Sequence, residues 1–175
     1  MTANGPQSPA RGTDVLRAGD VPLANDPARA APDAHLVYIG RICSAWVEGT
    51  TTPKNPTEAR ARSTAARIEI LPPFRPGLLG LAAYSHVFVL AWLDGARRDI
   101  IVHQPRHLSA PRGVLATRAP VRPNPIGLSV ARILAVDVAA GVVILDAIDF
   151  RDGTPVLDLK PYRPGIDAIP DALIG

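Results

Sequence analysis

Three polar side chains of different chemistry alternate near the C-terminal end of the sequence, in the run "VLDLKPY". Successive side chains of an extended segment point to opposite faces, so Asp158, Lys160 and Tyr162 would share one face, with apolar residues on the other. A carboxylate, an ammonium and a phenol are groups that can transfer protons and bind polar ligands. A solvated Asp–Lys pair, worth under about 1 kcal/mol, accounts for the spacing equally well.

The run "VRPNPIGLS" holds two further candidates, Arg122 and Asn124, each directly before a proline. Proline disfavours the helical conformation in the residue that precedes it, so both backbones should be extended and both side chains held in one direction. A planar guanidinium can bind a carboxylate or a phosphate, and an amide offers one acceptor and two donors. The alternative is a proline-braced turn that leads into a strand.

An apolar run, "SHVFVLAWLD", has His86 near its start and Asp94 at its end. His86 has no second histidine at ligand spacing and no nearby thiol, so we expect no metal site there. We assign His86 to substrate binding as a hypothesis, beside the alternative of a histidine packed in the core. Asp94 could accept hydrogen bonds from a ribose or an amine, or could begin a turn.

Composition indicates one domain with a local excess of arginine. A chain of 175 residues with 47% hydrophobic content can bury one good core. The net charge is only +3, yet six arginines and one acidic residue lie between Arg97 and Arg122. Such a segment suits phosphate or nucleic acid, although a solvated surface explains it too. The single cysteine, Cys43, excludes an internal disulfide. Without an apolar membrane span or a secretory signal, we expect a cytoplasmic protein.

The order of elements favours a mainly β fold. Residues 1–34 have no sustained period and predict a disordered leader, followed by a domain over 35–171 and a tail over 172–175. Extended segments are expected at 35–46, 66–74, 87–93, 112–120, 128–150 and 152–162, with a hairpin turn at 139–141 and short helical pieces between them. Strands of these lengths suit a small antiparallel barrel or a tightly curved sheet. No glycine-rich dinucleotide or phosphate fingerprint is present, which argues against a Rossmann fold.

Two separated motifs, "RGVLATRAPVRPNPIGLSVARIL" and "DGTPVLDLKPY", resemble the TsaA-like family, also called TrmO or YaeB, of S-adenosylmethionine-dependent methyltransferases. The runs "IGRICSAW" and "LGLAAYSHVFVLAWLD" support the resemblance, which covers about 37–171. It implies a small single-sheet antiparallel β-barrel with few short helices, a homodimer, and S-adenosyl-L-methionine near the subunit boundary. It also implies methylation of the exocyclic N6 amine of threonylcarbamoyladenosine beside the tRNA anticodon.

The resemblance also implies a set of cofactor-binding positions. These are Pro53, Lys54, Asn55, Leu93, Asp94, Arg118, Leu128, Asp146, Ala147, Ile148 and Asp149. Lys54 and Asn55 replace an Arg-Gln pair of the tRNA-modifying members, and Asp94 replaces a histidine. Lysine offers a point charge where arginine offers a fork, so the exchange is not neutral at a bidentate site.

For methyl transfer we predict the following roles. Arg122 would bind a substrate phosphate or carboxylate, and the Asn124 carbonyl would accept from the amine to be methylated. Asp158 would accept the proton, oriented by Lys160, with Tyr162 stacking or donating. Two alternatives remain: a methyltransferase for a small-molecule acceptor, and a cofactor-sensing or RNA-binding module without turnover.

Overall fold

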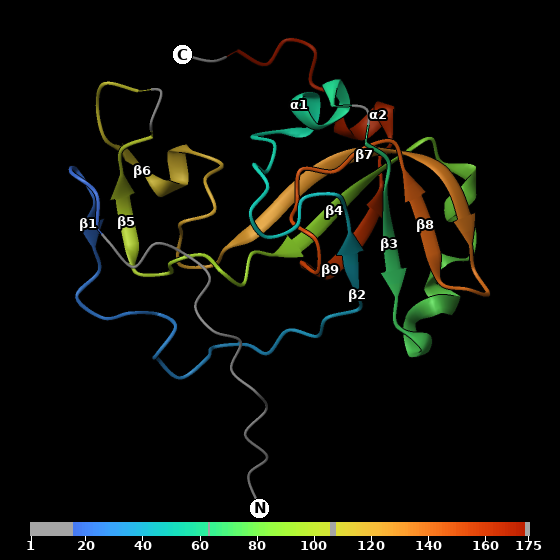
Figure 1. The fold of residues 1–175 in the computed structure, drawn as a ribbon, viewed down its shortest axis with the longest axis horizontal. Coiled ribbons are helices and arrows are strands. Elements are labelled where there is room, and N and C mark those ends of the chain that lie inside the picture. The colour runs from blue at the N-terminus through green and yellow to red at the C-terminus, as the bar shows by residue number, and fades with distance from the viewer. Residues whose placement is uncertain (1–15, 63, 106–107, 174–175) are drawn as a thin grey trace, which may run out of the picture. The chain divides into compact units, whose positions relative to one another are not determined.

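The computed structural model describes residues 16–62, 64–105 and 108–173 (Figure 1). The described chain divides into two compact units, one formed by residues up to His35 together with Leu93–Gly127, the other by Leu36–Trp92 together with the residues from Leu128 onward. The strands are β1 (Val21–Pro22), β2 (Gly40–Cys43), β3 (Ala66–Ile70), β4 (His86–Trp92), β5 (Ile100–His103), β6 (Arg112–Gly113), β7 (Ile126–Asp137), β8 (Val142–Leu145) and β9 (Pro155–Pro161). The helices are α1 (Pro56–Ala61) and α2 (Pro164–Asp167), with 3-10 turns η1 (Pro72–Leu78), η2 (Leu81–Ala83) and η3 (Val114–Ala116).

Six strands close into a barrel in the order β2-β3-β8-β7-β4-β9, and the registers that join them are antiparallel. Alternate side chains fill its interior, as period-two strands require. Ile68 and Ile70 of β3 were expected on one face, and both are buried there. Val87, Val89 and Ala91 of β4 are fully buried as well. The predicted mainly β barrel is therefore confirmed.

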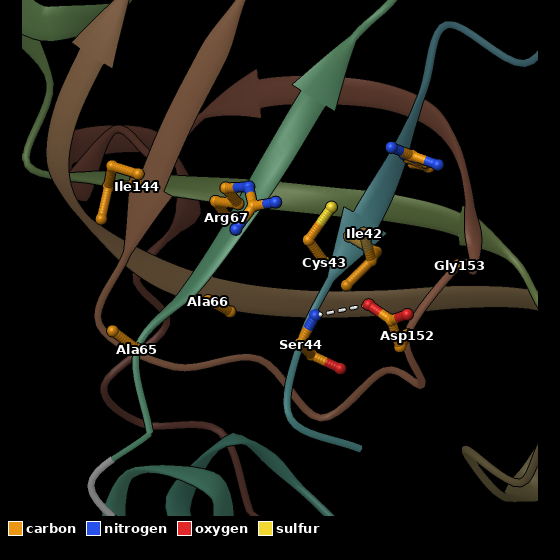
Figure 2. Close-up of a pocket in the computed structure, with 10 residues that line it drawn as sticks. Ile42, Cys43, Ser44, Ala65, Ala66, Arg67, Ile144, Asp152 and Gly153 are labelled. Atoms are coloured by element: carbon orange, nitrogen blue, oxygen red, sulfur yellow. Dashed lines mark hydrogen bonds between the residues drawn. The ribbon is translucent and has the colours of Figure 1, made fainter. Parts of the chain in front are cut away.

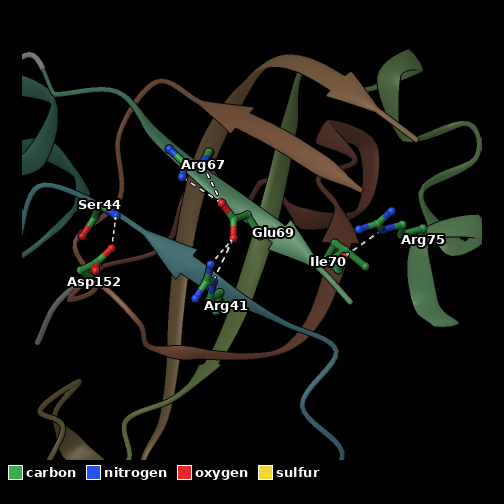
Figure 3. Close-up of polar contacts among 7 residues, drawn as sticks. All are labelled: Arg41, Ser44, Arg67, Glu69, Ile70, Arg75 and Asp152. Carbon is green, nitrogen blue, oxygen red and sulfur yellow. Dashed lines mark hydrogen bonds and ion pairs between the residues drawn. The ribbon is translucent and has the colours of Figure 1, made fainter. Parts of the chain in front are cut away.

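The hairpin between β7 and β8 turns where the sequence predicts it. Gly141 has φ +73°, a conformation that favours glycine, and its N–H donates to the Asp137 carbonyl at 2.9 Å. Arg75 of η1 donates to the Ile70 carbonyl at 3.3 Å and to the Ala139 carbonyl at 3.1 Å, so one guanidinium ties this hairpin to β3 (Figure 3 shows the bond to Ile70).

The structure differs from the sequence-based fold at three places in the other unit. A second sheet, in the order β1-β5-β6, accompanies the barrel, so the fold is not a single sheet. Strand β1 lies within the predicted leader and pairs with β5, so the expectation of disorder is wrong for Val21–Pro22; residues 1–15 lie outside the described residues. The strand expected at 112–120 is only Arg112–Gly113, followed by η3.

One further difference concerns the start of the barrel domain. Of the extended run expected at 35–46, only Gly40–Cys43 forms a strand, and Leu36, Val37 and Tyr38 before it are exposed. Gly40 is required at the start of β2, because a side chain there would collide with the Glu69 carbonyl. No helix among the described residues is long and apolar enough to cross a membrane.

Candidate functional site

The three polar residues of "DLKPY" lie together on the outer face of the barrel. Asp158 pairs in register with Leu90, and Lys160 pairs with Phe88, both on the side of β4 that faces away from the core. The Lys160 ammonium lies 2.7 Å from Asp158 Oδ2, and Asp158 Oδ1 accepts from the Leu159 N–H at 2.8 Å. The carboxylate is thus fixed in direction, while its side chain is still 45% exposed and open to a ligand.

Aromatic side chains continue this outer face. The Tyr162 ring lies 5.4 Å from the Phe88 ring and 6.3 Å from the His86 ring, edge-on to the latter. The Tyr162 N–H donates to the His86 carbonyl at 3.0 Å, and Ser85 Oγ lies 2.9 Å from His86 Nδ1. His86, predicted to bind substrate, is half-buried and directly beside the predicted catalytic residue Tyr162.

The predicted cofactor residues Pro53, Lys54 and Asn55 lead into helix α1. Asn55 is the N-cap, and its Oδ1 accepts from the Glu58 N–H at 2.8 Å. The Glu58 carboxylate in turn accepts from the Lys54 N–H at 3.0 Å, and this bond, followed by one from Arg62, lowers the pKa of Glu58. The Asn55 side chain is therefore engaged in folding the segment, whereas the Lys54 side chain is exposed.

Helix α1 is tied to the second predicted cofactor segment, Asp146–Asp149. Arg60 Nε donates to Asp146 Oδ2 at 2.7 Å, and the same guanidinium donates to the Val130 carbonyl at 2.8 Å. Asp146 Oδ1 also accepts from the N–H groups of Arg132 and Ala147. Burial alone would raise the pKa of Asp146, but the hydrogen bonds from Arg60 and the two N–H groups outweigh it, so the pKa lies below its ordinary value.

A buried cluster packs against the same segment, Asp146–Asp149. Trp46, Ala59 and Ala147 pack together, and Trp46 Nε1 donates to the Ile148 carbonyl at 2.7 Å. Arg62, at the end of α1, lies over the Trp46 ring at 5.3 Å. The structure therefore brings residues 53–55 and 146–149 into one assembly through α1, which the sequence did not predict.

Other candidate residues belong to the unit that contains Leu93–Gly127. The Leu93 N–H donates to the Pro125 carbonyl at 2.8 Å, and Asp94 is exposed in the following turn. Arg98 donates to the Pro123 carbonyl at 2.6 Å and to Asn124 Oδ1 at 3.4 Å. The proline brace is thus reinforced by a guanidinium, and the exposed Asn124 amide is held from one side.

Arg122 has partners that the sequence did not predict. Its guanidinium donates to the carbonyls of Val114, Thr117 and Ala119 at 3.1 to 3.5 Å. Those carbonyls would otherwise pair with a strand, which explains why residues 112–120 fold as a turn and not as the predicted strand. Arg118 of the same segment is exposed. Arg122 therefore holds the loop that carries Arg118, and its predicted contact with substrate stays a prediction.

Four neighbouring strands connect the cofactor segment to the aromatic face. The Asp146 N–H donates to the Arg132 carbonyl of β7, and the Ile133 N–H of β7 donates to the Ser85 carbonyl at the start of β4. Tyr162 follows on β9, through its bond to His86. Three strand spacings of about 4.8 Å put Asp146 and Tyr162 about 14 Å apart along the sheet. Leu128, on the exposed side of β7, is 45% exposed.

A cavity of about 460 Å³ lies over β2 and β3 and contains none of the predicted residues (Figure 2). Arg41 and Arg67 border it, and both donate to Glu69 and hold its pKa at about 2 (Figure 3). Burial, followed by a hydrogen bond with Glu69, raises the pKa of the Cys43 thiol. A protonated thiol is a poor nucleophile, so this cavity lacks reactive chemistry.

The residues present suit S-adenosylmethionine and offer nothing for a metal. No three His, Cys, Asp or Glu side chains converge within the described ranges to ligate an ion. The exposed Lys54 ammonium matches a carboxylate, and the half-buried Asp149 carboxylate matches an amine or ribose hydroxyls. Both belong to segments joined through α1, and their assignment to the two ends of the cofactor stays a prediction.

Sequence reasoning missed the residues that hold the site. Arg60, Trp46 and Arg98 each bind a backbone carbonyl or a predicted site residue. The sequence contained no signal for these contacts, because each joins segments at least 25 residues apart. Only the N-cap Asn55 with Glu58 three residues later could have been read as a helix start.

Comparisons with known proteins give consistent results. Residues 41–168 match the family described as the tRNA-methyltransferase O N-terminal domain, within the span where the sequence resemblance was found. The solved structure of TrmO from Pseudomonas aeruginosa is 40% identical, with a TM-score of 0.66 over 84% of this chain and 62% of that chain. "Probable S-adenosyl-L-methionine-binding protein VirR" of Rhizobium radiobacter is 37% identical over 79% of this chain and 78% of its own length. A "Probable S-adenosyl-L-methionine-binding protein" of Archaeoglobus fulgidus is 43% identical over 70% of this chain, which spans only 33% of that relative.

Proposed function

The chain belongs to the family of tRNA-methyltransferase O N-terminal domains, and from this premise we propose that it is an S-adenosyl-L-methionine-dependent methyltransferase. Its acceptor is the exocyclic N6 amine of threonylcarbamoyladenosine beside the tRNA anticodon. The observation that carries the proposal is the fixed, half-exposed Asp158 carboxylate beside Lys160 on the same barrel as the α1 assembly. We further propose that the protein acts in the cytoplasm as a homodimer. Sedimentation of the purified chain tests its oligomeric state.

Some of these residues hold the cofactor, and others accept the proton from the acceptor amine. Bound S-adenosyl-L-methionine supplies an electrophilic methyl group on its sulfonium. Lys54 and Asp149 hold its charged and hydroxyl groups, and the Trp46 cluster keeps the segment Asp146–Asp149 in place. Such an in-line displacement depends mainly on positioning and electrostatics.

The acceptor amine is a weak nucleophile because its lone pair is delocalised. Asp158 accepts the proton that the amine loses, and its direction is set by Lys160 and by the Leu159 N–H. The exposed Asn124 amide accepts from Arg98, and its contact with the acceptor amine is a prediction. The exposed Arg118 and its neighbours supply positive charge for the RNA backbone.

The test is incubation with methyl-labelled S-adenosylmethionine and total bacterial tRNA, followed by nucleoside mass spectrometry. Label on N6 of threonylcarbamoyladenosine supports the proposal, and tRNA that lacks the threonylcarbamoyl group serves as the matched control. Activity on tRNA should fall steeply with added salt, because several phosphate contacts release counterions. Bound cofactor without any labelled nucleoside would refute the tRNA acceptor and favour a small molecule.

A further inference from the structure

A second cavity, of about 340 Å³, opens at the end of β9. It is lined by Tyr84, Tyr162 and residues 163–166. Its volume lies at the lower end of the range of about 300–1,000 Å³ typical of small-ligand pockets. Only Tyr162 among its lining residues was a candidate from the sequence, so the chemistry of the rest has no assigned role.

Two tyrosines from distant segments form the aromatic part of this cavity. Tyr84 follows η2, with its N–H bonded to the Leu81 carbonyl at 3.1 Å, and is 37% exposed. Tyr162 is held by its ring contacts with Phe88 and His86. Aromatic rings that line a cavity are suited to stacking on a planar ring, and a ring that its neighbours already fix, as for Tyr162, loses little freedom on binding.

One cation borders the same cavity. The Arg163 side chain is exposed, and among the described residues no hydrogen bond or ion pair involves its guanidinium; the hydrogen bonds of Arg163 are made by its backbone, whose N–H donates to Asp167 at 2.7 Å. A guanidinium matches the oxygens of a phosphate. At the rim, a side chain added to Gly165 would meet no atom within 4 Å, so the approach is open. The cavity therefore selects a planar ring that carries an anion.

We propose that this cavity binds one nucleotide of the RNA acceptor, with its base stacked on Tyr84 and Tyr162 and its phosphate on Arg163. The inference rests on the proposed function, and it names the residues that hold the acceptor strand. Its location supports it, because Tyr162 lies beside the Asp158–Lys160 pair and about 14 Å along the sheet from the cofactor segment. A nucleotide bound in this cavity would lie only a few nucleotides along the RNA strand from the base that is methylated.

The test compares Tyr84→Ala, Tyr84→Phe and Arg163→Ala with Arg29→Ala, which removes another exposed arginine, from the other unit. The probes are an anticodon stem-loop RNA that carries threonylcarbamoyladenosine, and free adenosine 5′-monophosphate. We expect Tyr84→Ala to weaken RNA binding about 5-fold to 100-fold, the range of base–aromatic stacking, and Tyr84→Phe to bind like the wild type. Arg163→Ala should weaken binding and reduce its salt dependence. The Kd for S-adenosylmethionine should not change in any variant.

Three results would overturn the inference. If Tyr84→Ala and Arg163→Ala differ from Arg29→Ala by less than twofold in the Kd for RNA, the cavity does not bind the strand. Adenosine monophosphate that binds as tightly as the RNA and depends on the same residues would assign the cavity to a free nucleotide instead. If the wild-type protein binds S-adenosylmethionine but no RNA, the proposed acceptor is refuted as well. If the wild type methylates tRNA and the variants bind RNA as tightly as the wild type, only the role of the cavity is refuted. Thermal unfolding checks each variant, and Tyr84→Leu or Arg163→Gln, which remove the ring or the charge but keep the bulk, replaces an alanine variant that does not fold.

Discussion

Replacement of Arg60 by alanine tests whether α1 and the segment Asp146–Asp149 form one cofactor site. Arg60 makes two contacts that join them, one to Asp146 Oδ2 at 2.7 Å and one to the Val130 carbonyl at 2.8 Å. One contact ends on strand β7 and the other on the segment that follows β8. Without Arg60, the segment keeps its backbone hydrogen bonds, the bond from Trp46 to the Ile148 carbonyl and the packing of Ala147 against Trp46.

The magnitude follows from the exposure of the two side chains. Hydrogen bonds to charged groups contribute about 1.5–3 kcal/mol when they are shielded, while exposed ion pairs contribute about 0–1 kcal/mol. Arg60 is 40% exposed and Asp146 is 22% exposed, which places the pair between these limits. We therefore expect a loss of about 1–2 kcal/mol in the free energy of unfolding, or about 2–8 °C in Tm for a chain of this size. If the same energy holds the segment in its binding form, the Kd for S-adenosylmethionine should rise about 5-fold to 30-fold.

Urea unfolding and calorimetric titration with S-adenosylmethionine measure the two effects separately. Arg60→Lys keeps the charge but not the fork, so it should fall between the wild type and Arg60→Ala. Arg67→Ala is the matched control, because it removes an exposed arginine of the barrel whose partner Glu69 keeps Arg41. In Arg60→Ala the pKa of Asp146 should rise, since burial raises it and one of the hydrogen bonds that offset burial is lost. A lower stability with an unchanged Kd would refute the reasoning and leave the contact purely structural.

Three further predictions concern the other parts of the chain. Asp158→Asn should lower the single-turnover methylation rate at least tenfold while the Kd for S-adenosylmethionine stays the same; a collapse of cofactor binding would instead place Asp158 in the cofactor site. Asn124→Ala should slow the same step, and Arg98→Ala should reproduce part of that loss; a rate within twofold of the wild type for Asn124→Ala would contradict its role. The pKa of Glu69, at about 2, lies below its unfolded value, so its contribution to stability is present above about pH 4.5 and is lost as the pH falls toward 2. Glu69→Gln should make the urea midpoint of unfolding depend less on pH over that interval. An unchanged slope of this midpoint against pH would contradict the effect.

The barrel strands could be predicted from the sequence because their pattern is local. Alternation of buried and exposed residues in β3 and β4, and a glycine at the β7–β8 turn, are read directly from neighbouring residues. The segment 112–120 has the same apolar character, yet it does not form a full strand. Its carbonyls are taken by Arg122, and a competition between a side chain and a strand partner has no signature in local sequence.

The sequence predicted the positions of the candidate side chains better than it predicted which of them are available to bind a ligand. Arg122 and Asn55 have the residue types that bind ligands, and the sequence assigns both to the site. In the structure the Arg122 guanidinium binds backbone carbonyls and the Asn55 amide caps a helix. Arg163 was not singled out, although its guanidinium is exposed beside a cavity. A residue type states what a group can bind, and only the folded chain decides which of its possible partners is within reach.

The face of β9 depends on one extra residue in that strand. Leu90 is opposite Asp158, but Ala91 is opposite Val156, so Leu157 is a bulge with no partner in the register. Val156 and Ala91 are both fully buried. Without the bulge, strict alternation from Val156 would point Asp158 and Lys160 into the apolar barrel, where an ion pair is costly. The bulge therefore lets the same strand fill the core at Val156 and present the polar pair outside, next to the aromatic rings that we assign to the acceptor.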